Sequence, residues 1–177
     1  MVPVSPMLPL RRSLPFITAS LALALVPAVG DARQKSIYDS DDLWATVNVC
    51  DTPDHPNTVG IRGSMPGSGV KDERMYMRFQ LQYFRASDKR WHNIGVGGDS
   101  GFMSVGSARY MVRQAGRNFT VRPPRTGSFI LRGAVTFEWR KDGEVVRRAR
   151  KRTRSGHPGT KGADPAKFSA ATCEVRD

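Results

Sequence analysis

Apolar and polar residues alternate one by one along residues 74–84 of this 177-residue chain. A period of two is typical of a strand that buries one face, because successive side chains point to opposite sides. Apolar residues at i, i+2 and i+4 do not make the 3.6-residue stripe of a helix. The stretch therefore predicts a strand with two different faces. One face carries Met75, Met77, Phe79, Leu81 and Tyr83, and the other carries Arg74, Tyr76, Arg78, Gln80 and Gln82.

A second alternating stretch, residues 129–140, leads into Asp142-Gly143. An Asp-Gly pair supplies the positive φ angles of a type I′ turn and is a strong signal for a β-hairpin. The return strand is expected at residues 144–154. Trp139 falls on the apolar side of this pattern, and we therefore expect it in the core.

Shorter strand-like runs separated by Gly- and Pro-containing turns fill the rest of the chain. They lie at residues 43–50, 58–65, 91–96, 102–105, 108–114, 118–121 and 168–175, and the runs at 108–114 and 118–121 can also be one strand bent at Gly116. No segment has a helical pattern. The sequence predicts an all-β fold, an antiparallel β-sandwich of about seven to eight strands, with a closed barrel as the alternative.

The segment LRGAVTFEWRKDGEVV, residues 131–146, resembles the late hairpin of immunoglobulin-like and fibronectin type III-like domains. The chain also has an N-terminus like a signal peptide, one cysteine near each end of the expected domain (Cys50 and Cys173), and a basic late hairpin. This layout resembles that of small exported bacterial proteins of unknown function. The resemblance implies an immunoglobulin-like sandwich and supplies no functional residue. It departs from antibody-type domains, because Cys173 lies in the last expected strand, after the hairpin.

The N-terminus has the pattern of a secretory signal peptide. Arg11 and Arg12 precede an apolar run over residues 14–27, and small residues follow it, which places cleavage within residues 28–32. The sequence thus predicts a signal peptide at 1–32, a flexible lead-in at 33–42, a β-sandwich domain at 43–177, and a secreted, extracellular protein. An uncleaved signal anchor is the alternative, and membrane contact is expected only through it.

Export gives the two cysteines a role. Cys50 and Cys173 are the only cysteines of the chain, and an oxidising compartment favours a disulfide between them. Two free buried thiols are the alternative.

The chain is strongly basic, with 28 Lys and Arg against 16 Asp and Glu. Such a charge attracts polyanions of any kind. Eight basic residues fall within residues 140–154, here called the basic arm: Arg140, Lys141, Arg147, Arg148, Arg150, Lys151, Arg152 and Arg154. The arm is interpreted as an anion-binding strip, or else as an edge strand that its charge protects from edge-to-edge pairing. The arm lacks the aromatic residues that single-stranded nucleic acid favours, so the expected partner is an anionic cell-surface polymer or protein.

Tryptophans offer a second binding hypothesis. Trp44 and Trp91 have no assigned place in the core, and either ring can stack on a sugar. The alternative function is therefore a carbohydrate-binding module that uses these rings.

The sequence gives little evidence for a catalytic site. The segment GGDSG, residues 97–101, is similar to a serine-protease nucleophile segment but lacks its second glycine, and a glycine-rich turn is expected instead. His55, His92 and His157 have neither the i, i+2 nor the i, i+4 partner of a zinc site. His55 and His157 each precede a proline in a polar loop, and we expect these two to be solvated side chains. The sequence predicts a non-catalytic protein without a metal or cofactor; a small hydrolase is a remote alternative.

Overall fold

The structure is a computed structural model, and it describes residues 36–176. The predicted signal peptide and the first residues of the lead-in lie outside the described residues. Within residues 36–176, no helix combines the length and the apolar character needed to cross a membrane. The described part of the lead-in forms a short 3-10 helix, η1 (Ile37–Asp39), and Ile37 packs against the core.

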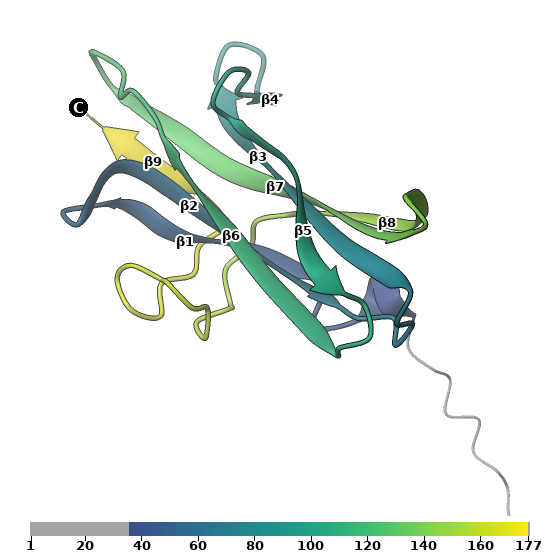
Figure 1. Cartoon of the computed structure of the whole chain (residues 1–177). Coiled ribbons are helices and arrows are strands. Elements are labelled where there is room, and N and C mark those ends of the chain that lie inside the picture. The colour runs from purple at the N-terminus through teal and green to yellow at the C-terminus, as the bar shows by residue number, and fades with distance from the viewer. Residues whose placement is uncertain (1–35, 177) are drawn as a thin grey trace, which may run out of the picture. The chain divides into compact units, whose positions relative to one another are not determined.

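The described chain folds into two antiparallel sheets, which confirms the predicted all-β class. Sheet A has the order β1–β2–β6. In sheet B, β3 and β7 lie side by side, β4 and β5 pair with the outer side of β3, and β8 and β9 pair with the outer side of β7 (Figure 1). The strands number nine among residues 36–176 and run as follows: β1 Trp44–Thr52, β2 His55–Pro66, β3 Glu73–Arg85, β4 Arg90–Asn93, β5 Asp99–Ser107, β6 Val112–Thr120, β7 Ser128–Lys141, β8 Glu144–Arg152 and β9 Cys173–Arg176.

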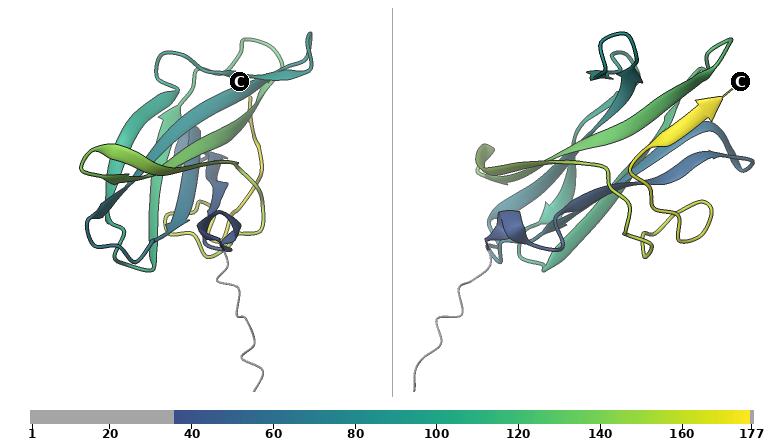
Figure 2. Two further views of the ribbon diagram at one scale, coloured as in Figure 1. Left: turned by 90° about the vertical axis from the view of Figure 1, so that its right-hand side faces the viewer. Right: turned by 180° about the vertical axis from the view of Figure 1, so that it is seen from behind.

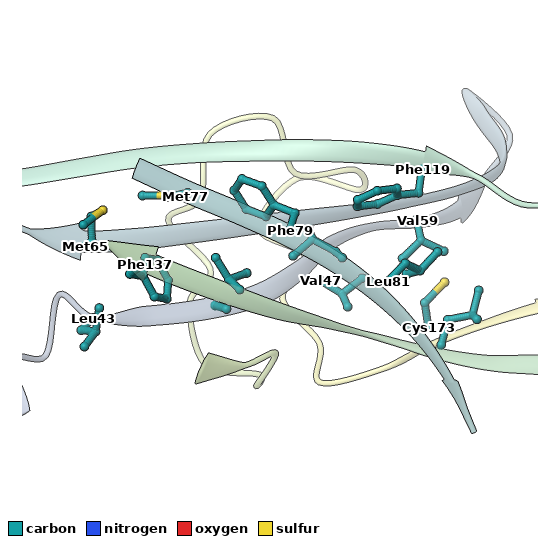
Figure 3. Close-up of a cluster of buried hydrophobic side chains, with 14 of the residues drawn as sticks. Leu43, Val47, Val59, Met65, Met77, Phe79, Leu81, Phe119, Phe137 and Cys173 are labelled. Carbon is teal, nitrogen blue, oxygen red and sulfur yellow. The ribbon is translucent and has the colours of Figure 1, made fainter. Parts of the chain in front are cut away.

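The core lies between the inner faces of the two sheets, and the alternating stretches supply much of it. Figure 3 shows part of this cluster, which includes Phe79 and Phe137 of sheet B and Val47 of sheet A. All three side chains are fully buried. Trp139 is also 0% exposed, as predicted, and its indole Nε1 donates a hydrogen bond to the Pro66 carbonyl oxygen at 3.0 Å. The residues that alternate with these buried side chains along each strand therefore lie on the outer faces of the two sheets.

The β7–β8 hairpin closes at the predicted turn. Asp142 has φ 51° and Gly143 has φ 88°, the positive angles that a primed two-residue turn requires. Beyond the turn, Thr136 of β7 lies opposite Arg150 of β8, and Ala134 lies opposite Arg152. Directly opposed residues share a face, so these two arginines lie on the outer face of sheet B.

A disulfide joins the two sheets. Cys50 of β1 and Cys173 of β9 are bonded, with their Cα atoms 5.4 Å apart, which confirms the predicted pairing. Strand β9 lies beside β7 near the C-terminus in the views of Figure 2. The bond thus ties an edge strand of sheet A to an edge strand of sheet B.

Several segments differ from their predicted form. The strand expected at 91–96 ends at Asn93, and the runs expected at 108–114 and 118–121 form one strand, β6, which begins at Val112. The glycine-rich stretch expected to be mostly loop is strand β5, because its glycines are accommodated at register shifts against β3, with Gly101 at φ 64° and Gly106 at φ 112°. The expected strand at 168–175 is shorter, since β9 begins at Cys173. The residues before Cys173 that were expected to belong to this strand run along β1 instead, where Ala170 forms an isolated bridge with Val47.

The loop between β8 and β9 covers part of the free edge of β1. The Asn48 side chain donates to the Gly162 carbonyl oxygen at 2.8 Å. The Asp164 carboxylate accepts a hydrogen bond from Thr52 and lies 2.9 Å from Nδ1 of His55. These contacts hold the loop against sheet A, and the loop carries His157 to the N-terminal end of β1, where it meets Trp44.

Candidate functional site

Part of the basic arm is neutralised by buried carboxylates. Glu138, 0% exposed, accepts hydrogen bonds from Arg140 and Arg148, with the Arg148 Nε–Oε1 distance at 2.7 Å. Glu73, 5% exposed, accepts two from Arg147 at 2.7 and 2.8 Å. Breaking such a pair is costly for folding, so these three arginines contribute to the stability of the sheet.

The other part of the arm has no such partners. Among residues 36–176, the side chains of Arg150, Arg152 and Arg154 form no ion pair or hydrogen bond, and Lys151 reaches only the Tyr38 carbonyl oxygen at 3.4 Å. We call these four residues the free arm. They line one cleft of about 930 Å³ at the edge of the sandwich where β8 leaves sheet B and β1 begins.

One wall of the cleft is built on the outer face of sheet B. The Arg132 guanidinium stacks over the Trp91 ring, 4.1 Å from its centroid, and its Nε donates to Gln82 Oε1 at 2.9 Å. Burial, followed by repulsion from Arg152 and Arg150, lowers the pKa of Arg132 below its ordinary value. The guanidinium remains charged, because arginine pKa values lie far above neutral pH. An anion bound here would relieve the repulsion.

The opposite wall is built on the start of β1. Trp44 and His157 stack with ring centroids 4.3 Å apart and an interplanar angle of 12°. Burial lowers the pKa of the His157 imidazole and so favours its neutral form. His157 is thus partly shielded, where the sequence predicted a solvated loop side chain. Asp39 and Asp41 add two carboxylates to the lining of the cleft.

The cleft therefore contains five cationic side chains, the free arm and Arg132, against two carboxylates. Trp44 and Trp91, which the sequence placed in a separate hypothesis, line the same cleft as the free arm. One face of each indole is already covered, by His157 and by Arg132. The arrangement is suited to a negatively charged group held by guanidinium groups, and less to a sugar stacked on a bare ring.

A second hollow, of about 650 Å³, lies at another part of the sandwich. Its lining is more apolar and includes Tyr83, Ile94, Val96, Val121 and Phe129. None of the residues of the basic arm lines it. It is therefore separate from the cleft.

The remaining candidates for chemistry have structural partners. The Ser100 hydroxyl accepts from the Phe79 backbone N–H at 2.9 Å and donates to the Gly101 carbonyl oxygen at 2.7 Å. Asp99 accepts two hydrogen bonds from Arg78 Nε, and Asp88 lies 2.8 Å from His92 Nε2. Among residues 36–176, no group of three or more His, Cys, Asp or Glu side chains is placed to hold a metal ion.

Two residues of the cleft, Arg132 and Gln82, were not singled out by the sequence as site residues. Both occupy polar positions in strands where polar and apolar residues alternate, and they lie directly opposite each other in the pairing of β3 with β7. The alternating pattern indicated that each residue lies on the polar face of its strand. It could not indicate that the two residues are neighbours, because the pairing register of two strands is not encoded in the local sequence of either.

Comparisons with known proteins give little support for an assignment. No family model matches the chain, and no curated protein matches it. Among solved structures, the chain is similar to the Pseudomonas fluorescens alkylpurine DNA glycosylase AlkC bound to DNA containing an abasic site analog. The match has 13% identity and a TM-score of 0.30, and it covers 65% of this chain and 30% of that chain. The chain thus spans less than a third of the glycosylase chain, and a likeness this low carries no conclusion about function.

Proposed function

We propose that this protein is an exported, non-catalytic binding domain of immunoglobulin-like type that holds an anionic surface polymer or protein partner through the free arm. The observation that carries the proposal is the cleft, where Arg150, Lys151, Arg152 and Arg154 gather beside Arg132. Structural ion pairs occupy the other arginines of the arm but not these. A role limited to protecting an edge strand gives no reason for Arg132 and two tryptophans to lie in the same cleft.

The disulfide supports the exported setting, since disulfides persist in oxidising compartments and are rare in the cytosol. The carbohydrate-binding alternative, a neutral sugar stacked on Trp44 or Trp91, is less well supported because one face of each ring is covered. The remote hydrolase alternative has no supporting constellation among the described residues.

The test is retention on an immobilised polyanion, heparin, at low and at physiological salt. The variant with Arg150, Lys151, Arg152 and Arg154 all changed to Ser should lose retention, because the effect of exposed charges is collective. Its far-ultraviolet circular dichroism should be unchanged, since none of the four is in an ion pair.

The matched control changes four exposed basic residues elsewhere to Ser: Lys71, Arg109, Arg125 and Lys161. It removes the same net charge. The control should be retained like the wild type. Equal loss in both variants would reduce the binding to net charge and overturn the proposal, as would failure of the wild type to bind at low salt.

A further inference from the structure

The cleft is one end of a longer basic surface on the outer face of sheet B. Because residues of one parity share a face, the register of β3, β7 and β8 places seven arginines on it. We call them the arginine track: Arg74, Arg78, Arg132, Arg140, Arg148, Arg150 and Arg152. Strand β9 adds one exposed ion pair, Arg176 with Glu174.

The track carries more positive than negative charge. The carboxylates that β3, β5, β7 and β8 contribute to this face are Glu138 and Asp99, which pair with Arg140, Arg148 and Arg78. Arg74 is exposed at the end of the track away from the cleft, and among residues 36–176 its side chain has no ion-pair partner. Seven arginines against two carboxylates leave the face cationic at both ends.

Two arginines of the track, Arg140 and Arg132, are stacked on aromatic rings. Arg140 lies 4.3 Å from the centroid of the Tyr76 ring and 4.7 Å from that of Phe102. Arg132 is held over Trp91 in the same way at the cleft end. Stacking itself uses no N–H donor. Arg140 already donates from Nε and Nη2 to Glu138, and Arg132 donates from Nε to Gln82. The Nη1–Nη2 edge of each guanidinium still offers a planar pair of donors to a carboxylate, sulfate or phosphate.

The two ends are too far apart for one small anion. Arg132 and Arg140 are 140 − 132 = 8 residues apart on β7, which corresponds to roughly 26 Å at about 3.3 Å per residue. On the basis of the proposed function, we infer that the ligand is a linear acidic polysaccharide that begins in the cleft and runs along the arginine track to a second subsite at Arg74, Arg78 and Arg140. Single-stranded nucleic acid is disfavoured, because guanidinium groups already cover the rings on which bases would stack.

The experiment compares the affinities of a heparin tetrasaccharide and a heparin dodecasaccharide by isothermal titration calorimetry at fixed salt. The tetrasaccharide is short enough for the cleft alone, and the dodecasaccharide is long enough for the whole track. Two linked subsites act at a high effective concentration, so the longer chain should bind roughly tenfold or more tightly. The double variant Arg74→Gln with Arg78→Gln should abolish this gain and leave tetrasaccharide affinity unchanged.

The control double variant, Lys71→Gln with Arg109→Gln, removes the same charge from exposed positions outside the track and should keep the gain. Equal affinity for both lengths in the wild type, or a gain that survives in the Arg74 and Arg78 variant, would overturn the proposed second subsite on the track. Neither result would contradict anion binding in the cleft. Failure of the tetrasaccharide to bind overturns the proposed function itself. Tighter binding of a single-stranded oligonucleotide than of the dodecasaccharide would overturn the choice of polysaccharide.

Discussion

Removal of the disulfide should destabilise the domain strongly without changing its fold. Cys50 and Cys173 are separated by 123 residues, and in the chain-entropy relation a loop of this size restricts the unfolded chain by about 16 cal/mol/K, or about 5 kcal/mol at 25 °C. Measured losses for native disulfides are typically 2–5 kcal/mol. The double variant Cys50→Ala with Cys173→Ala should therefore lose about 2–5 kcal/mol of the ~5–15 kcal/mol expected for a domain.

Urea unfolding followed by tryptophan fluorescence measures this loss, because the fully buried Trp139 becomes exposed to solvent on unfolding. With a slope of about 2 kcal/mol/M, a loss of 3 kcal/mol moves the midpoint down by ~1.5 M. The slope should also rise, since an uncrosslinked chain exposes more surface when it unfolds. Wild type reduced with dithiothreitol should follow the variant. Coincident midpoints for oxidised wild type and variant would refute the reasoning.

Two further predictions concern stability. Gly133→Ala should cost about 1–3 kcal/mol, since a Cβ atom there would lie 2.7 Å from Cδ1 of the buried Ile61 side chain, whereas Gly159→Ala, with no atom within 4 Å, should be nearly neutral in the same urea assay. Stability should also fall in acid. Burial alone would raise the pKa of the Glu73 carboxyl, but hydrogen bonds, including those from Arg147, outweigh it and lower the pKa. The contribution of Glu73 is thus present above its ordinary pKa of about 4.3 and lost as the pH falls toward the lower folded value. Thermal unfolding from pH 6 to 2 should show a weaker dependence in Arg147→Ser; identical profiles would contradict this.

The alternating pattern was sufficient to predict much of the fold. Met75, Met77, Phe79 and Leu81 are all 0% exposed, as their shared parity indicated. The pattern failed at β5, where glycines that indicate a loop are accommodated in a strand by register shifts against β3. Such shifts depend on the partner strand and leave no local signal.

The division of the basic arm could not be predicted from its own sequence. Arg147 and Arg150 look alike there, and the difference comes from carboxylates contributed by other parts of the sheet. Glu73 is 74 residues away from Arg147 in the chain, and only the pairing of β3 with β7 and of β7 with β8 brings them together. The choice between structural and free arginines is therefore a property of the fold.

The most direct test of the cleft is an NMR titration of the protein with the heparin tetrasaccharide, observing tryptophan indole and arginine Nε–H signals. The account predicts that the signals of Trp91, Arg132, Arg150 and Arg152 shift together and saturate at one affinity, while the buried Trp139 indole stays in place. Saturable shifts confined to residues outside the cleft, with these four signals unmoved, would contradict it.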